Sequence, residues 1–424
     1  MKSFKQLGMI MPTAIGGSTG GNTGGGSSGS SGGSGGGGSV VGVSPKAVNF
    51  RDYDGTVLHS YTKDEALALT ALPELPTRAG LICQEWNWSF EDMQSYVADY
   101  GVCEVGATYI TDDGKTRLYI TIAVEGRMDV PLYFQQTVEN GVTIDWGDGS
   151  ATETLSGTGN VNTSHTYASV GEHVISLDVA DGCTLSLGHD TSNYCVMGSI
   201  GNRYCNMLQK VEVGNGVTSI ESYAFSNCYS LVSIIIPNGV TIIDTNTFKA
   251  CYSLASIIIP NGVTSIESYA FSNCYSLVSI IIPNGVKRIE AYAFYNCYFL
   301  ASIVIPNSVT NIEKSVFNNC HSLASIIISN GVSLIKDAAF QACYSLASIV
   351  IPNSVTRIEG SPFISCSGVV FFDFSSHTAV PTLSSSNAFN KTPSDCEIRV
   401  PAALVDTWKA ATNWSTYADN IVGV

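Results

Sequence analysis

Hydrophobic positions recur every 23 residues through the second half of the chain. Cysteine, phenylalanine, leucine and isoleucine each return at this interval, for example at Phe225 and Phe248 and at Leu231 and Leu254. A fixed period with several apolar positions predicts a solenoid, in which each unit forms one coil. The cysteine position is occupied by Cys205, Cys228, Cys251, Cys274, Cys297, Cys320, Cys343 and Cys366.

One repeat unit, starting at Cys228, reads CYSLVSIIIPNGVTSIESYAFSN. Its Leu-x-x-Ile-x-Ile segment predicts a strand whose inward residues are Leu231, Ile234 and Ile236, because side chains alternate between the two faces of a strand. Proline at 237 then ends the strand. The units predict about nine coils over residues 205–400, with one parallel sheet. They resemble the BspA-like, treponemal-type subclass of leucine-rich repeats over residues 205–373.

The outward strand positions are those of Val232, Ser233 and Ile235 and their equivalents. They predict a smooth, neutral face. We therefore assign residues 184–373 to the solenoid and residues 374–424 to a C-terminal cap, in which Leu404, Trp408 and Trp414 lie on an amphipathic helix. Solenoids need caps because an open last coil leaves apolar core in water.

Residues 48–61 alternate apolar and polar around Asp54-Gly55, which predicts a hairpin. Helix-permissive and strand-like segments continue to about residue 124, including an expected strand pair around TYITDDGKTRLYITI. About 40 residues of this region resemble the internalin-type B repeat, which implies a β-grasp-like module, and we assign residues 40–124 to that module. The match departs from that family at Ile82 and Glu85. It rests on Val48, Phe50, Asp52, Asp54, Gly55, Pro76, Arg78, Gly80 and Trp86.

Asp52 and Asp54 do not predict a calcium loop. An EF-hand starting at Asp52 requires Gly at position 57 and Glu at position 63, where Val57 and Lys63 stand. A hairpin turn accounts for both carboxylates without a metal.

Residues 125–183 contain the segments TIDWGDGS, HTY and GEHVISLDV. They resemble the PKD-type β-sandwich, whose modules act as spacers and binding platforms. The residues that carry the resemblance are Trp146, Gly147, Asp148, Gly149, Ser150, His165, Thr166, Tyr167, Gly171, Val174, Leu177 and Val179. We expect His165 to make a structural hydrogen bond to the WGDGS turn.

The chain starts with a short segment, residues 1–15, in which Gly8 and Pro12 interrupt the apolar run that a signal peptide needs. This segment is interpreted as a docking or weak signal-like segment. Residues 16–39 are all Gly, Ser, Thr or Asn. Such a composition predicts a flexible linker.

Charge limits the possible partners. The 424 residues carry a formal net charge of −15, and only one excess acid falls in residues 201–373, which hold 9 acids and 8 bases. No basic cluster exists for nucleic-acid phosphates or anionic lipids. No apolar run reaches the length of a spanning helix. We predict no cofactor, no metal and no membrane insertion.

The eight repeat cysteines are predicted to form a structural ladder of buried, reduced thiols that all point into the core, with disulfides as the alternative. The other five, which lack C-x-x-C spacing, do not indicate zinc. They are Cys83, Cys103, Cys183, Cys195 and Cys396.

Aromatic residues beside each cysteine are the candidate ligand-binding residues, since tyrosine suits protein or sugar surfaces. The alternative is that the rings shield turns between coils. The candidates are Tyr229, Tyr252, Tyr275, Tyr298 and Tyr344, joined by His321 in the same row, and a second row of Tyr223, Tyr269 and Tyr292.

No catalytic residues are predicted, because the repeat acids are expected to form an exposed row in which burial raises no pKa. The row comprises Glu221, Asp244, Glu267, Glu290, Glu313 and Glu359. The sequence favours a non-catalytic recognition or adhesion protein of a microbial surface that binds an extended protein or glycan. The alternative is a phage virion component that attaches to a host cell, docked through residues 1–15. In either case residues 184–424 are expected to fold alone and keep binding.

Overall fold

The computed structural model describes residues 48–189, 194–199 and 203–424. The predicted docking segment and linker, residues 1–39, lie outside this part of the chain. Residues Ser44–Val424 form one compact unit. Within the described residues, no helix has the length and apolar character needed to cross a membrane.

The first element of the fold, which we call the N-terminal module, spans residues 48–111. Its four-stranded sheet has the order β2-β1-β4-β3, in which only β1 and β4 are parallel. The predicted hairpin is present. The elements are β1 (Val48–Arg51), β2 (Val57–Tyr61), α1 (Lys63–Leu67), β3 (Leu81–Trp86), α2 (Phe90–Tyr100) and β4 (Cys103–Thr111).

Sequence signals at the helix ends explain where the module's helices lie. The hydroxyl of Thr62 accepts from the Glu65 amide, and the Glu65 carboxylate accepts from the Thr62 amide, so a capping box starts α1. The hydroxyl of Ser89 accepts from the Asp92 amide at the start of α2, and Gly101 ends that helix at φ 75°.

The expected strand pair after α2 does not form. β4 belongs to the module, whereas β5 (Thr116–Ile122) pairs with β10 (Gly171–Val179) and with β14 (Leu208–Glu212). The sequence thus predicts the strand β5 correctly but not its partners. The chain therefore leaves the module near residue 112, not near residue 124.

Two sheets follow the module, and we call them the sandwich. Their orders are β16-β14-β5-β10-β7-β8 and β15-β11-β6-β9. The remaining elements of this region are η1 (Glu125–Arg127), β6 (Asp129–Gln136), β7 (Val142–Asp145), β8 (Glu153–Thr154), β9 (Gly159–Thr166), β11 (Leu185–Leu187), β12 (Tyr194–Cys195), β13 (Gly198–Ser199), η2 (Arg203–Met207), β15 (Val217–Ile220) and β16 (Ser233–Ile234).

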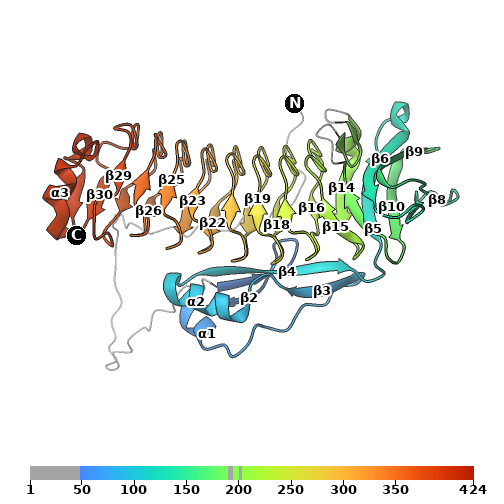
Figure 1. The fold of residues 1–424 in the computed structure, drawn as a ribbon, viewed down its shortest axis with the longest axis horizontal. Coiled ribbons are helices and arrows are strands. Elements are labelled where there is room, and N and C mark those ends of the chain that lie inside the picture. The colour runs from blue at the N-terminus through green and yellow to red at the C-terminus, as the bar shows by residue number, and fades with distance from the viewer. Residues whose placement is uncertain (1–47, 190–193, 200–202) are drawn as a thin grey trace, which may run out of the picture. The chain divides into compact units, whose positions relative to one another are not determined.

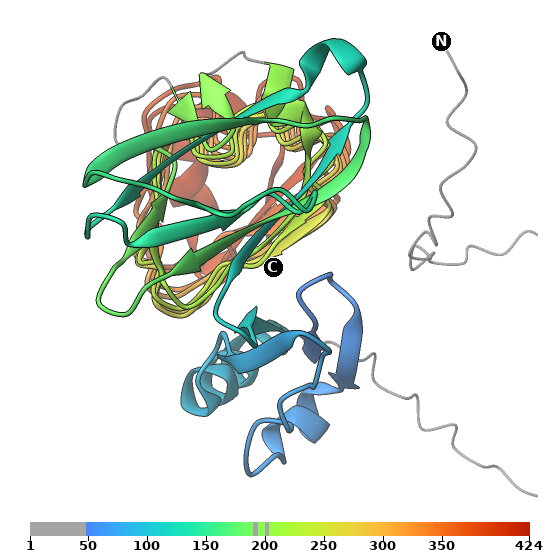
Figure 2. The same cartoon turned by 90° about the vertical axis from the view of Figure 1, so that its right-hand side faces the viewer.

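The sandwich and the solenoid share one core. β14 and β15, the first solenoid strands, pair with β5 and β11 of the sandwich. A single cluster of buried residues runs from Leu118 to Ile421. Viewed along the stack, the coils lie behind the sandwich strands (Figure 2). The sandwich is therefore the N-terminal cap of the solenoid, and the expected boundary between residues 183 and 184 does not separate two cores.

The predicted solenoid of about nine coils is confirmed (Figure 1). Each coil contributes two short strands, so the repeats form two parallel rows where the sequence predicted one sheet. The first row contains β18 (Ser256–Ile258), β20 (Ser279–Ile281), β22 (Ser302–Ile305), β24 (Ser325–Ile328), β26 (Ser348–Val350), β28 (Phe371–Asp373) and β30 (Glu397–Val400). The second contains β17 (Ile242–Ile243), β19 (Ser265–Ile266), β21 (Arg288–Ile289), β23 (Asn311–Ile312), β25 (Leu334–Ile335), β27 (Arg357–Ile358) and β29 (Thr382–Leu383).

Equivalent residues pair across neighbouring coils. Ser256 pairs with Ser279, and Leu334 pairs with Arg357. The predicted inward residues Leu231, Ile234 and Ile236 are all buried. Phenylalanine rings stack coil on coil through the core, with centroids 5.3–5.6 Å apart from Phe225 to Phe363. Repeated side chains thus fill the core as ladders.

The last coil is closed by η3 (Ala402–Leu404), α3 (Val405–Ala410), η4 (Trp414–Tyr417) and β31 (Ile421–Gly423). The helix is shorter than the sequence suggested. Trp408 and Trp414 are nonetheless buried against Phe374, and β31 adds a parallel strand to β30.

One residue of each coil, two positions after the core phenylalanine, has positive φ. Asparagine tolerates this left-handed conformation better than other non-glycine residues. Asn273, Asn296 and Asn319 occupy it and link their side-chain amides into a chain of 2.7 and 2.8 Å hydrogen bonds. Alanine occupies it at 250 and 342, with φ 60° and 58°.

We expect Ala250→Asn to stabilise the protein by about 1 kcal/mol. A left-handed backbone conformation costs alanine ~1–2 kcal/mol, and alanine has no side-chain amide to join the row of asparagine hydrogen bonds. Urea unfolding would measure the gain. Ala250→Gly is the control, since it relieves the backbone without adding an amide, and it should gain less. An asparagine variant less stable than the wild type would contradict this account.

Candidate recognition surface

The outward face of the first strand row is only partly free, contrary to the expectation from sequence, although Val232 and Val350 are still 51% and 56% exposed. Ile235, Ile258 and Ile281 are only 4%, 8% and 5% exposed. Ile235 belongs to the core of the N-terminal module, with Val304 and Ile327 packed against that core. The module thus covers the Ile235 position in several coils, a part of the outward face that the sequence had left free.

Glycine allows the close approach of the module. A Cβ atom added to Gly106, in β4, would lie 2.7 Å from Cγ2 of Ile258. Beside it, Asn87 donates to the carbonyl of Ile259 at 2.9 Å and accepts from the Gly106 amide at 2.6 Å. Asn87 is fully buried. The contact therefore combines apolar packing with satisfied polar groups.

The module also contacts the Pro-Asn and Ser-Asn turns of successive coils. Asn261 donates to the carbonyl of Trp86 at 3.1 Å, and Asn284 donates to the carboxylate of Asp92 at 3.0 Å. The Tyr100 hydroxyl donates to Asn307 at 3.0 Å and accepts from the Asn330 amide at 2.6 Å. One repeated residue of the solenoid thus serves as a row of attachment points within the chain.

The predicted row of aromatic residues forms a continuous stack, which we call the tyrosine ladder. Its ring centroids are 4.5–4.8 Å apart, and the first four rings are within 11° of parallel. His321 and Tyr344 continue it at 4.8 Å. Each interior ring has both faces against neighbouring rings, so the ladder presents ring edges and hydroxyl groups.

In the second predicted row, Tyr269 and Tyr292 stack at 4.7 Å, and the ammonium group of Lys249 lies 5.5 Å from the Tyr269 ring. Tyr223, Tyr269 and Tyr292 all have positive φ. Asn246 interrupts the row between the first two. This row is therefore shorter and more irregular than the tyrosine ladder.

Residues beside the tyrosine ladder extend it into a wider strip, which we call the ridge. It comprises the positions of Tyr229, Ser230 and Val232 in six coils, and none of these positions carries Asp, Glu, Lys or Arg, with His321 as the one titratable imidazole. Several of its apolar side chains are well exposed: Val232 by 51%, Val278 by 41%, Phe299 by 59% and Tyr344 by 46%. Exposed apolar area concentrated in one strip marks an interaction site more often than scattered apolar residues do.

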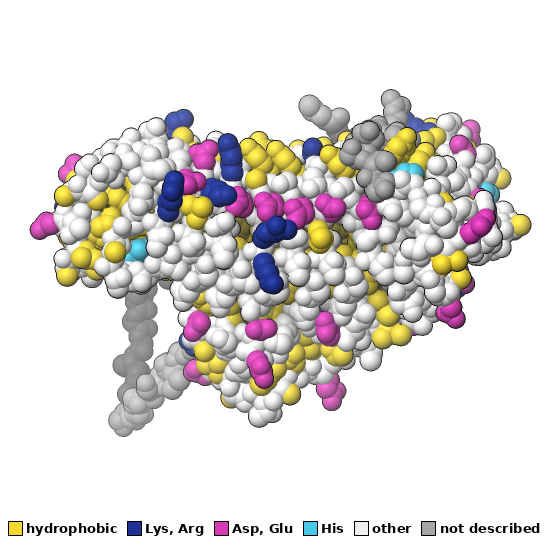
Figure 3. All heavy atoms as spheres, in the orientation of Figure 1, with side chains coloured by type: hydrophobic (Ala, Val, Ile, Leu, Met, Phe, Trp, Pro, Cys, Tyr) yellow, Lys and Arg dark blue, Asp and Glu magenta, His cyan; other side chains and the backbone are white. Residues whose placement is uncertain are grey.

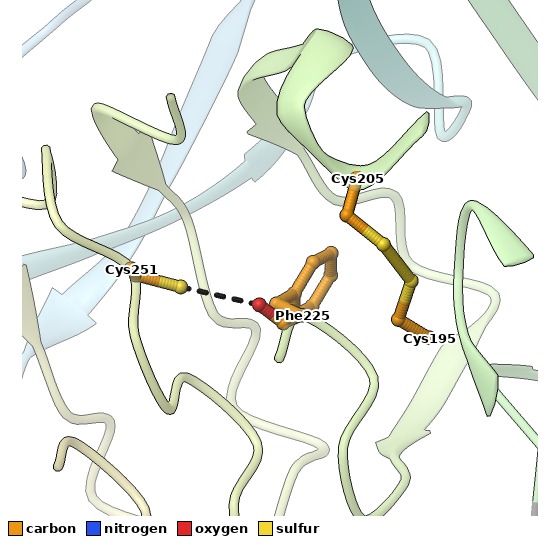
Figure 4. The surroundings of a disulfide bond; sticks show 4 residues. All are labelled: Cys195, Cys205, Phe225 and Cys251. Atoms are coloured by element: carbon orange, nitrogen blue, oxygen red, sulfur yellow. Dashed lines mark hydrogen bonds between the residues drawn. A yellow bond between two sulfur atoms is a disulfide. The ribbon is translucent and has the colours of Figure 1, made fainter. Parts of the chain in front are cut away.

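The ladder cysteines from Cys228 to Cys366 are free and buried. Six of them donate to the carbonyl of a phenylalanine 26 residues earlier; Cys251, for example, donates to Phe225 at 3.2 Å (Figure 4). Burial raises the pKa of every one, to about 12 for Cys366. These thiols therefore act as hydrogen-bond donors to the backbone carbonyl groups of the preceding coil.

Cys205 does not belong to this thiol ladder, and its predicted reduced state is wrong. It forms a disulfide with Cys195 of β12 (Figure 4). Cys205 lies in the first coil of the solenoid. The sandwich takes the place of a preceding coil there, so Cys205 has no phenylalanine carbonyl of a preceding coil as a partner.

We expect iodoacetamide at pH 8 to label none of the seven remaining ladder cysteines in the native protein, because only a thiolate reacts and these thiols are both buried and protonated. In denaturant, mass spectrometry should count 11 labelled cysteines without reductant and 13 with it. Labelling of 13 cysteines without reductant would contradict the disulfide.

The acid row is less exposed than expected. The side chains of Glu267, Glu290 and Glu313 are 24%, 31% and 17% exposed. Burial, followed by the charges of Glu313 and Glu267, raises the pKa of Glu290. Arg288 pairs with Glu267 at 3.3 Å, and Lys336 pairs with Glu313 at 2.6 Å. Figure 3 shows acidic side chains in a row across the coils with basic groups beside them.

The expected hydrogen bond of His165 is present. Its Nε2 lies 2.7 Å from the carboxylate of Asp148, and Tyr167 donates to the carbonyl of Trp146 at 2.8 Å. Hydrogen bonds from Ser150 and His165 lower the pKa of Asp148. These contacts hold the turn to the neighbouring strand, as a structural role requires.

Asp52, for which the sequence predicts no calcium loop, is a buried carboxylate that is 1% exposed. It accepts from Arg78 Nε at 2.6 Å and from the Tyr109 hydroxyl at 2.7 Å. The bond to Asp52 raises the pKa of Arg78, and burial raises that of Tyr109. No group of three or more potential metal ligands occurs within the described ranges.

Three solved structures resemble parts of the chain. A leucine-rich cell surface protein of Faecalibacterium prausnitzii is 32% identical, over 40% of this chain and 45% of that protein, with a TM-score of 0.37. A leucine-rich repeat protein of T. pallidum is 30% identical, over 36% and 72%, with a TM-score of 0.33. One from Bacteroides ovatus is 21% identical, over 68% and 81%, with a TM-score of 0.38.

This chain therefore spans less than half the length of the F. prausnitzii protein. No curated protein matches it. The family described as BspA type leucine-rich repeat region matches in six copies, over residues 198–301 and 287–408. These ranges coincide with the coils and their C-terminal cap. The chain belongs to the BspA-type leucine-rich repeat proteins.

Proposed function

We propose that this protein is a non-catalytic recognition protein of a microbial surface, which binds an extended partner through its repeats. The ridge is the observation that carries the proposal. It repeats similar side chains, without Asp, Glu, Lys or Arg, in six coils, and it exposes apolar groups that the core does not use. Repetition of one weak contact along an extended partner raises avidity without new chemistry.

Other surfaces of the repeats are less suited to this role. The Ile235 position of several coils and several Asn-containing turns are already occupied by the N-terminal module. The acid row is engaged in ion pairs with Arg288 and Lys336. A leucine-rich relative is itself described as a cell surface protein, which supports the proposed location.

The test compares two variants that add the same charge. The ridge variant carries Val232→Lys, Val278→Lys and Phe299→Lys. The control variant carries Ile242→Lys, Thr264→Lys and Thr310→Lys, which are exposed residues in or directly before strands of the second row. Labelled full-length protein is incubated with bacterial cells and with cultured epithelial cells, and retention is measured by flow cytometry.

We expect the ridge variant to lose at least tenfold in retention and the control to stay within twofold of the wild type, because burying an unpaired ammonium group in an interface is costly. Circular dichroism should show both variants folded. Equal retention of the ridge variant and the wild type would contradict the proposal, and so would equal loss in both variants.

A further inference from the structure

The spacing of the ridge restricts the shape of its partner. Ring centroids of the tyrosine ladder are 4.5–4.8 Å apart over six coils. The backbone of the ridge has the same repeat, since the Ser276 amide donates to Tyr252 at 3.1 Å and the Val278 amide donates to Ala255 at 2.9 Å. A partner that contacts every coil in the same way needs a repeat of equal length.

Extended and helical segments lying along the ridge do not have that repeat. A helix has a pitch of about 5.4 Å, so it would drift by about 3 Å over the five intervals of the ridge. A strand lying along it repeats every two residues, or about 6.7 Å, and would lose register within the first two coils. Strands stacked across the ridge are spaced by about 4.7–4.8 Å and would stay in register along its whole length.

The aromatic groups argue against a sugar ligand. A tyrosine ring binds a sugar through its open face, whereas each interior ring of the ladder lies between two neighbours. The first four rings are nearly parallel, at interplanar angles of 2–11°. The ring edges, serine hydroxyls and short aliphatic side chains that remain are the groups that interdigitate between paired stacks of identical strands.

Charge points to the same kind of partner. None of the ridge positions is charged, although the chain has a net charge of −15. The cores of protein interfaces are depleted of charge and enriched in tyrosine and phenylalanine, the residues found here. The ridge is therefore suited to an uncharged protein surface with ladders of its own.

We propose that the partner of the ridge is the side of a protein fibre built from stacked β-strands. Rows of identical side chains on the fibre would pack against the rows of side chains on the ridge. This inference rests on the proposed function and names the class of partner for the same surface. Contact would be made coil by coil, so its strength grows with the number of coils in register.

The probe is a set of fibrils assembled from a short, uncharged, amyloid-forming peptide. Full-length protein is sedimented with the fibrils, with the same peptide in monomeric form, and with microcrystalline cellulose as an insoluble glycan. We expect saturable binding to the fibrils alone. The ridge variant should bind the fibrils at least tenfold more weakly, and the control variant should bind within twofold of the wild type.

Binding to cellulose without binding to fibrils would overturn the inference in favour of a glycan. Fibril binding that is equal in both variants would place the contact outside the ridge and would also overturn it. Should the chain bind no fibrils while cell retention stays dependent on the ridge, this inference fails and the proposed function stands. Cell retention that is independent of the ridge defeats the proposed function itself.

Discussion

A chain that begins at residue 184 is expected not to fold as a monomer, whereas one that begins at residue 44 should melt at the same temperature as the full-length protein. The first truncation removes β5 and β6, the partners of β14 and β11. It leaves the first coil of the solenoid without its cap.

The size of this effect follows from the side chains that lose their cover. Four residues of β14 and β15 are at most 3% exposed in the complete protein, and exposing such side chains costs ~1.5–3 kcal/mol each, or ~6–12 kcal/mol together. Domains have a total stability of about 5–15 kcal/mol. The four residues are Leu208, Val211, Val217 and Ile220.

Circular dichroism and size-exclusion chromatography of both truncated chains would check this. Residues Ser44–Val424 form one compact unit, so the longer chain is the matched control. A monomeric fragment 184–424 with the thermal stability of the control would show that the sandwich does not act as a cap.

Asp52→Ala is expected to destabilise the N-terminal module by about 1–3 kcal/mol, the usual cost of leaving a buried hydrogen-bond donor without its partner. The substitution leaves the Arg78 guanidinium unpaired and removes the acceptor of the Tyr109 hydroxyl, which is fully buried. A buried donor without a partner pays its full desolvation penalty.

Hydrogen exchange of the β1 and β4 amides during urea titration would measure the loss in the module separately from the solenoid. Asp54→Ala is the control, because Asp54 is exposed in the same turn and only accepts from the Thr56 amide. It should cost less than about 1 kcal/mol. An equal effect of both substitutions would mean that the buried pair has no special role.

Sequence patterns predicted the solenoid well because the period repeats many times. The inward residues Ile234 and Ile236 follow from alternation and Leu231 from the repeated leucine position, and the structure buries all three. The free thiols of the later coils also follow from equivalence, since each coil places its cysteine above the same carbonyl. Repetition lets one local rule be applied to every unit.

The incorrect predictions share a physical cause. A sequence pattern indicates which face of a strand is apolar, but it does not indicate which other segment packs against that face. Ile235 points outward as expected, yet the module buries it. The alternation of β5 is correct, yet its partners are β10 and β14. Cys205 occupies the ladder position, yet Cys195 reaches it from β12. The covering of Ile235 restricts the candidate surface to the ridge.

The attachment of the module to repeated asparagines has a consequence for how such an array can change in length. Successive coils offer Asn261, Asn284 and Asn307 at the same turn, and each is separated from the next by one unit of 23 residues. Duplication of a unit between them would therefore return an equivalent asparagine to every contact. The array could grow by whole units, moving its C-terminal cap outward by about 4.8 Å for each, while the module kept its contacts with the asparagine turns.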